Sequence, residues 1–311
     1  MRRFVKHGTV EGGPGRKCRD MEGLTLVELL LALLLTGLIL AAVYNLFGSQ
    51  ENTQVLVDQL SEMNQNLRIA ANTILMDMRQ AGYHVEGGVA SSGLGQLRAI
   101  VVQDGGTTNP DELTVLYAIP GFEAKLTSSY STPGGQASID DGCPPVSGGI
   151  TRTCHQSSPT CFCSGDLVIM TDGRTSSVFR VTSPARDGPT QLVLGTSSSY
   201  NDSDGHEGSG FPAGGYGEGS RVFKAVLRTY RVDRTTYPRL PRLRVTEGIA
   251  PEEISSNQTL VDGIEDLQIS PTGANNHSYE VAITARTRKA VPGSGYRRRT
   301  ITETVRVRNL Q

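Results

Sequence analysis

A single charged side chain lies inside the longest apolar run of this sequence. Within residues 24–47, Glu28 is the only acidic or basic residue. Placing a carboxylate in a membrane-length apolar helix costs about 2.5–3.5 kcal/mol on insertion scales. Such a group needs a partner, so we expect Glu28 to lie in a binding or assembly site.

Clustered cysteines are the second group that could do chemistry. Cys18 lies far upstream, and the others fall within 21 residues of a Gly-, Pro- and Ser-rich segment, at Cys143, Cys154, Cys161 and Cys163. In an oxidising compartment this cluster predicts two disulfides, for which three pairings are possible. Metal binding is the less favoured alternative, because the C-x10-C-x6-C-x-C spacing lacks paired C-x2-C motifs.

A weaker metal candidate is the acidic segment that contains Asp202, Asp204 and Glu207. These carboxylates resemble part of a calcium loop, but Tyr200 occupies the position of the first ligand in the D-x-D-x-D-G pattern. A solvated polar loop is the favoured interpretation. We therefore predict neither a metal nor another cofactor.

Known catalytic motifs do not occur in the sequence. The five histidines are scattered, and there is no G-x-S-x-G, no H-E-x-x-H and no phosphate-binding loop. We expect a non-catalytic protein without a small-molecule substrate. Two alternatives stay open, an enzyme with dispersed catalytic residues and a membrane-tethered binding module.

The end of the chain is rich in cations that could contact DNA or another anionic surface. These are Arg286, Arg288, Lys289, Arg297, Arg298, Arg299, Arg306 and Arg308. Few aromatic residues lie among them, so the outward face of a strand is the favoured interpretation. The whole chain has a formal net charge of −1, and we do not expect nucleic acid as a partner.

The charges that flank the apolar run predict its orientation. Basic residues dominate before it, whereas Glu51, Asp58 and Glu62 follow it before the next cation, Arg68. About 20 apolar residues cross a bilayer, and positive charge favours the cytoplasmic side. We expect a cytoplasmic leader over residues 1–23, a span over 24–47 and an extracytoplasmic remainder. A cleavable secretory signal is less favoured, because its apolar region is normally about 7–15 residues long.

Helical periodicity continues beyond the apolar run. Apolar residues recur at steps of three and four, at Leu56, Leu60, Met63, Leu67, Ala70, Ile74 and Met78. Arg79 and Gly82 then provide a C-terminal cation and a stop signal. We predict one helix over residues 24–81, whose second half packs on the chain's own domain rather than in a coiled coil.

Residues 82–311 predict a β-rich domain with Cys- and Gly-rich loops. The expected strands are Leu97–Gln103, Glu112–Ile119, Asp166–Thr171, Ser177–Thr182, Gln191–Leu194, Ser220–Asp233, Arg242–Thr246, Ser278–Arg286 and Thr300–Arg308. Residues 261–269 fit a strand or a turn plus a strand, and segments 127–164 and 195–219 are expected to lie outside the core. The fold class is therefore α+β, with a long helix laid on an antiparallel sheet.

These features resemble the type IV pilin-like superfamily. The residues Gly23-Leu24-Thr25-Leu26-Val27-Glu28, followed by an unbroken apolar helix, resemble the prepilin cleavage and methylation motif. Residues 66–83 resemble the helix end of PilW-type minor pilins, and residues 305–310 resemble their last strand. The lack of a helix-kinking proline near Asn45 also favours a minor subunit. Minor pseudopilins of type II secretion, of the PulJ/GspJ type, are the alternative.

The resemblance implies a type IV pilin-like fold and a route of assembly. Prepilin peptidase would cleave after Gly23 and methylate the amine of Leu24, and Glu28 would pair with that ammonium on a neighbouring subunit. The implied partners are prepilin peptidase, other minor pilins, the major pilin, the pilus assembly platform and the bacterial inner membrane. The C-terminal domain is then expected in the periplasm and later on the pilus at the cell surface.

Overall fold

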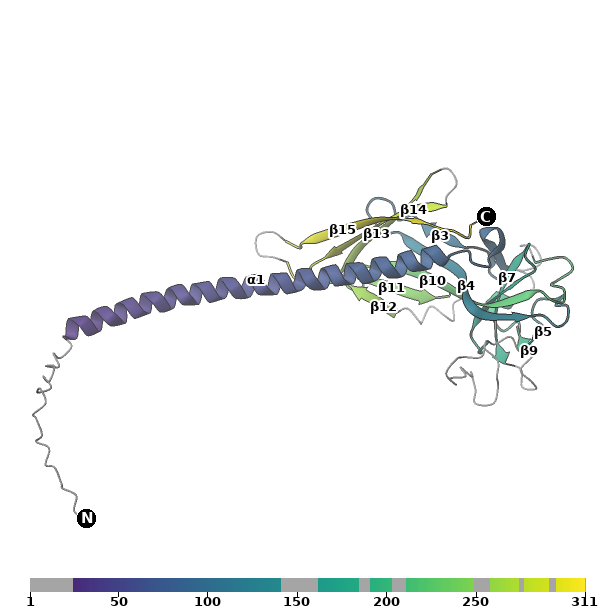
Figure 1. The fold of residues 1–311 in the computed structure, drawn as a ribbon, viewed down its shortest axis with the longest axis horizontal. Coiled ribbons are helices and arrows are strands. Elements are labelled where there is room, and N and C mark those ends of the chain that lie inside the picture. The colour runs from purple at the N-terminus through teal and green to yellow at the C-terminus, as the bar shows by residue number, and fades with distance from the viewer. Residues whose placement is uncertain are drawn as a thin grey trace, which may run out of the picture. The chain divides into compact units, whose positions relative to one another are not determined.

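The chain forms one long helix followed by a sheet-rich domain, which confirms the coarse α+β expectation (Figure 1). The structure, a computed structural model, describes residues 25–140, 162–184, 191–202, 211–248, 258–273, 277–290 and 295–310. It divides into two compact units, the first ending at Val55 and the second beginning at Leu56. Helix α1 spans Leu26–Gln80, close to the predicted residues 24–81.

Most elements after α1 are short strands. They are β1 (Val89–Ser92), β2 (Gly95–Arg98), β3 (Ile100–Gln103), β4 (Glu112–Lys125), β5 (Gln136–Ser138), β6 (Leu167–Thr171), β7 (Ser176–Arg180), β8 (Ser183–Pro184), β9 (Gln191–Val193), β10 (Arg221–Asp233), β11 (Arg242–Glu247), β12 (Gln258–Asp262), β13 (Ile264–Thr272), β14 (Ser278–Arg286) and β15 (Arg298–Arg306). Two 3-10 turns, η1 (Glu86–Gly88) and η2 (Ser199–Asn201), lie between them.

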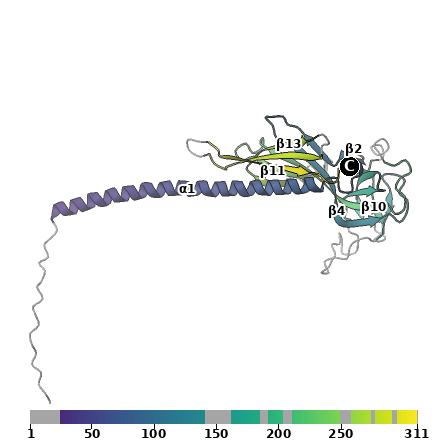
Figure 2. The ribbon, with the colours of Figure 1, turned by 45° about the horizontal axis from the view of Figure 1, so that its top comes forward.

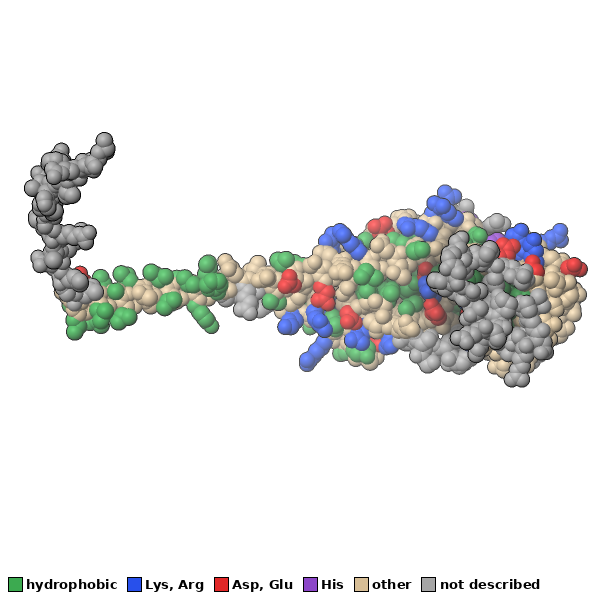
Figure 3. Space-filling view, turned by 60° about the horizontal axis from the view of Figure 1, so that its bottom comes forward, with side chains coloured by type: hydrophobic (Ala, Val, Ile, Leu, Met, Phe, Trp, Pro, Cys, Tyr) green, Lys and Arg blue, Asp and Glu red, His purple; other side chains and the backbone are tan. Residues whose placement is uncertain are grey.

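The first half of α1 is apolar on all sides and uncovered. Its segment Leu26–Phe47 has 22 residues, a mean hydropathy of 2.7 and no buried part, and Figure 3 shows apolar side chains along it. Within the described residues, this is the one helix that is long and apolar enough to cross a membrane. Burying a large aliphatic side chain is worth about 1.5–3 kcal/mol, so this half is stabilised by apolar surroundings.

The largest sheet is built around β10, which pairs antiparallel with β4 along one edge. Along its other edge β10 pairs first with β6 and then with β11, so the two strands share that edge end to end. The full order is β12-β11-β10-β6-β7-β1-β2, and β3 pairs with β4. Alternating burial along β10 is what a sheet with one face in the core requires.

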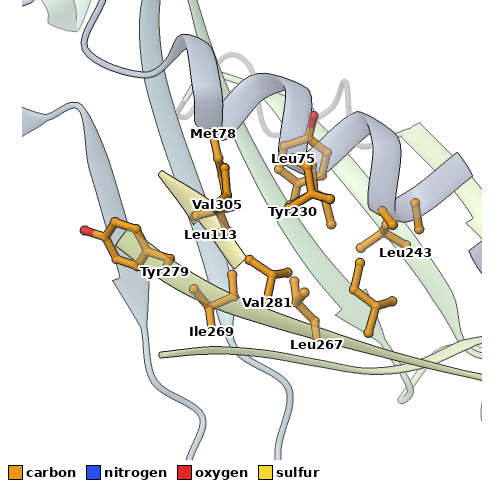
Figure 4. Packing of buried hydrophobic residues seen from close by; sticks show 14 of the residues in the cluster. Leu75, Met78, Leu113, Tyr230, Leu243, Leu267, Ile269, Tyr279, Val281 and Val305 are labelled. Atoms are coloured by element: carbon orange, nitrogen blue, oxygen red, sulfur yellow. The ribbon is translucent and has the colours of Figure 1, made fainter. Parts of the chain in front are cut away.

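The second half of α1 packs on the small sheet β13-β14-β15 and on strands of the large sheet (Figure 2). Figure 4 shows Leu75 and Met78 of the helix pointing at side chains from these strands, among them Val281 and Val305. The predicted stripe from Met63 to Met78 is the buried face of the helix. Packing on the chain's own domain is thus confirmed.

Two predicted strands are interrupted by a change of partner. The strand expected over residues 97–103 breaks at Ala99, whose N–H donates to the Gly88 carbonyl at 2.6 Å. The chain then leaves β1 and pairs with β4 instead. Gly263, at φ 79°, similarly separates β12 from β13, so residues 261–269 comprise the end of one strand, a one-residue break and a second strand. Only glycine adopts this backbone conformation without strain.

The segments predicted to lie outside the core are in part core. Residues from them form a second hydrophobic cluster with β6 and β10, to which Tyr130, Ile139, Phe162 and Tyr216 contribute. Strand β5 lies in the first segment and pairs with β9, and β9 pairs with β8 in a third sheet. The prediction failed because isolated aromatic residues in a glycine-rich segment have no periodicity to detect.

An antiparallel sheet was predicted, but one strand pair of the large sheet is parallel. β1 pairs parallel with β7 at Ser91 and Ser177, and their buried hydroxyls are 2.7 Å apart. Small polar side chains that satisfy each other allow the two backbones to meet in the interior. The connection from β1 to β7 is long, as a parallel pair requires.

Candidate functional site

The first turn of α1 forms a capping box around Glu28. The Thr25 N–H and hydroxyl both donate to Glu28 Oε2 at 3.1 Å, and the Glu28 N–H donates to Thr25 Oγ1 at 3.3 Å. Reciprocal bonds of this kind satisfy amide groups that have no partner within the helix. The T-x-x-E pattern before an apolar run is the sequence signal for this cap, which was not predicted.

The cap leaves half of the Glu28 carboxylate free. Both bonds from Thr25 go to Oε2, whereas Oε1 has no hydrogen-bond partner among the described residues, and the side chain is exposed. A carboxylate offers about four acceptor positions, so Glu28 can bind a cation and still cap the helix. Gly23 and Leu24, the predicted cleavage and methylation residues, lie outside the described residues.

Of the four clustered cysteines, the structure describes one, Cys163. Cys163 is disulfide-bonded, which removes its thiolate from metal binding. Its backbone N–H donates to Asp166 Oδ2 at 2.7 Å, which anchors the turn before β6. Cys143, Cys154 and Cys161 lie outside the described residues, so the pairing stays a prediction.

The calcium candidate is also only partly described. Asp202 is exposed at the end of η2, and Asp204 and Glu207 lie outside the described residues. Within the part of the chain that the structure describes, no group of three or more His, Cys, Asp or Glu side chains could hold a metal ion.

A buried carboxylate at the other end of α1 was not predicted. Asp77 is only 4% exposed and accepts hydrogen bonds from the Tyr117 hydroxyl at 2.9 Å and the Tyr230 hydroxyl at 2.5 Å. Arg228 Nη1 lies 3.3 Å from Asp77 Oδ2, and Arg228 Nη2 lies 3.1 Å from Glu247 Oε1. We call Asp77, Tyr117, Arg228, Tyr230 and Glu247 the Asp77 network. It ties α1 to β4, β10 and β11.

The Asp77 network keeps its hydroxyl groups protonated. Burial, together with the negative charge of Asp77, raises the pKa of both Tyr117 and Tyr230. Each tyrosine therefore remains a hydrogen-bond donor to the carboxylate. The sequence signal was an acid between Ile74 and Met78 in the apolar stripe, where an unpaired charge would be costly.

The cations at the end of the chain do not all face outward. The Arg286 side chain is 10% exposed, and its guanidinium lies 3.2 Å from Glu265 and 4.4 Å from the centre of the Tyr296 ring. Arg298 also donates to Glu265, and this bond is the main reason why the pKa of Glu265 is lowered. Part of the predicted cationic surface is therefore engaged in ion pairs with Glu265.

A groove of about 470 Å³ opens where β6 and β11 meet the same edge of β10. Lys224 and Arg228 lie along it on one face of β10. Lys224 is paired with Asp166 at 2.7 Å and Arg228 with Glu247 at 3.1 Å. Because acids neutralise these cations in place, the groove does not have the uncompensated charge that an anion site needs.

Comparison of the chain with models of protein families, with curated proteins and with solved structures finds no match. The candidate site is the pair Thr25 and Glu28 at the start of an uncovered apolar helix.

Proposed function

We propose that this chain is a PilW-like minor pilin, a non-catalytic subunit that takes part in priming and assembling type IV pili. One observation carries the proposal. An acid with a free carboxylate oxygen stands in the first turn of an uncovered apolar helix, five residues after Gly23. The sheet-rich second unit is consistent with the head domain of such a subunit.

The proposed route begins with hydrolysis of the peptide bond between Gly23 and Leu24 by prepilin peptidase. Hydrolysis leaves an α-amine on Leu24. The same enzyme then transfers a methyl group to this neutral amine from a sulfonium methyl donor, with release of a proton, and the N-methylated amine is protonated to an ammonium at neutral pH. The chain waits in the inner membrane with residues 24–47 in the bilayer and the domain in the periplasm. Assembly transfers the apolar helix from lipid to the other minor pilins and the major pilin.

Glu28 has two compatible roles in this route. Through Oε2 it caps its own helix, and through Oε1 it can accept the Leu24 ammonium of a neighbouring subunit. Removing one partner of a buried ion pair typically costs about 3–5 kcal/mol. This free energy would favour subunits that dock with the correct stagger.

Two substitutions separate the roles. Gln is accepted at this position of a capping box, so Glu28→Gln keeps the cap and removes the charge, whereas Glu28→Ala removes both. We expect both variants to be cleaved normally and to lower the number of surface pili to a similar extent. Pili are counted by electron microscopy, and cleavage is followed by the mass of the chain.

A normal number of pili with Glu28→Gln, together with a lower number with Glu28→Ala, would mean that Glu28 acts only as a helix cap and that its charge is not needed for assembly. Co-purification with secretion components and not with pilus components would instead identify the chain as a type II secretion pseudopilin.

A further inference from the structure

Within the described residues, the outer edge of β15 has no partner strand. In the order β13-β14-β15, β15 pairs with β14 alone. The Thr287 N–H donates to the Arg297 carbonyl at 2.9 Å, and the Val307 N–H donates to the His277 carbonyl at 2.8 Å. These two bonds fix which residues of β15 face β14.

Bonded and non-bonded positions alternate along an antiparallel pair. The odd-numbered residues from 297 to 307 therefore direct their N–H and C=O groups at β14. The even-numbered residues direct theirs at the open edge, and these are Arg298, Thr300, Thr302, Thr304 and Arg306. Within the described residues, none of these backbone groups has a hydrogen-bond partner.

The opposite edge of the same sheet is closed by the chain itself. Asp111 donates its N–H to the Leu267 carbonyl at 2.8 Å and accepts the Ile269 N–H at 2.6 Å through Oδ2. Arg234 Nε donates a hydrogen bond to the Glu265 carbonyl oxygen at 2.6 Å. The backbone and side chain of Asp111 and the side chain of Arg234 thus protect the β13 edge, whereas the β15 edge stays accessible for a further strand.

The side chains of β15 suit strand addition. Thr300, Ile301, Thr302, Thr304 and Val305 are β-branched, and every residue of β15 except Ile301 and Val305 is exposed. β-branched residues favour extended backbone, so the edge is already in the conformation that a new strand needs. Nine residues are enough to pair with a strand of ordinary length.

The positive charge of β15 and its flanking residues favours an acidic binding partner. Residues 297–308 contain five arginines and one acid, Glu303. Arg298 is paired with Glu265, and Arg299 Nη1 donates to Asn64 Oδ1 at 2.8 Å. Arg299 and Arg306 have no ion pair within the described residues. In the register centred on Thr302, a second copy of β15 added antiparallel would place its Arg306 opposite Arg298, and like charges directly opposite each other are destabilising.

We propose that β15 binds an extended, acidic segment of another protein by strand addition. Main-chain hydrogen bonds to residues 298–306 would give affinity, and acidic side chains opposite Arg299 and Arg306 would give specificity. The proposal is independent of the proposed function, because strand addition at this edge does not require cleavage or incorporation into a fibre.

The test uses the full chain in detergent micelles and a fluorescent nine-residue peptide that alternates Thr and Val and carries Glu near both ends. Binding is measured by fluorescence anisotropy. We expect saturable binding that weakens with added salt. A matched peptide with Lys in place of Glu should bind at least about 10-fold more weakly, which corresponds to about 1.4 kcal/mol.

Thr302 offers a matched pair of variants. Its N–H faces the open edge, so Thr302→Pro removes one edge donor without breaking a bond to β14, as proline on edge strands allows. Thr302→Val keeps the donor and changes only the side chain. Thr302→Pro should lower peptide affinity at least about 10-fold relative to Thr302→Val. Equal affinity of the two variants would overturn the proposal.

Hydrogen exchange on the unsubstituted chain gives an independent measurement. Peptide binding should protect the amides of Thr300, Thr302 and Thr304 and leave those of Ile301 and Glu303 unchanged, because the latter already face β14. Uniform protection, or none, contradicts strand addition. A dimer of the chain that Thr302→Pro abolishes, without peptide binding, would show that a second copy is the occupant and would also overturn the proposal.

Discussion

Glu28 and Asp77 are acids of the same helix, but the chain satisfies them to different degrees. Asp77 is buried, and both of its oxygens accept hydrogen bonds from residues of β4 and β10. Glu28 is exposed, and within the described residues its carboxylate accepts hydrogen bonds at one oxygen, Oε2, from Thr25 of its own turn. An acid that its own chain satisfies fixes the fold, whereas an acid with a free oxygen is available to another molecule.

The leucines of α1 show the same contrast. Leu67 is fully buried in the second unit, whereas Leu34 is 61% exposed in the first. Both residues have the same side chain in the same kind of helix, so the difference lies in what surrounds them. The second half of α1 packs on apolar side chains of its own domain, whereas the first half needs apolar surroundings that the described chain does not provide.

The largest expected effect comes from removing Asp77. In Asp77→Ala, Arg228 and the two tyrosine hydroxyls lose their buried acceptor, and we expect the free energy of unfolding to fall by about 3–5 kcal/mol. Asp77→Asn keeps an acceptor oxygen and should have a smaller effect. Urea unfolding of the full chain in detergent measures both, with Glu62→Ala, on an exposed part of the same helix, as the control.

Truncation of leucines tests the two halves directly. Leu67→Ala creates a cavity in the core and should lower the free energy of unfolding of the domain by about 2–5 kcal/mol. Leu34→Ala, the matched change in the first half, should leave it within about 0.5 kcal/mol. A comparable loss for both variants would mean that the chain covers the first half of α1 after all.

The buried tyrosines also predict a loss of stability at alkaline pH. Burial raises the pKa of Tyr216 from an ordinary 10.0 to about 12, and the pKa values of Tyr117 and Tyr230 are raised as well. A raised pKa in the folded state gives stability that is complete below pH 10 and is lost as the pH rises toward 12. The midpoint of urea unfolding should therefore decrease over this range. A constant midpoint would contradict the buried positions of these hydroxyls.

The elements with strong periodicity could be predicted from sequence. Helix α1 and β14 were predicted nearly to the residue, because a heptad-like stripe and strict alternation are local signals. The second hydrophobic cluster was missed, since Tyr130 and Phe162 are isolated apolar residues whose contacts are all long-range. The Asp77 network was missed for the same reason, as Tyr117 and Tyr230 lie 40 and 153 residues from Asp77. The position of Glu28 at the start of the apolar helix was predicted, and its capping role was not.

Mass spectrometry of the mature N-terminus tests the central claim most directly. The claim is that α1 begins as a processed helix whose free end and Glu28 serve contacts with other subunits. Cells with active prepilin peptidase should yield a chain that starts at N-methylated Leu24. A product that still begins upstream of residue 24 would contradict the account and leave a single membrane tether in its place.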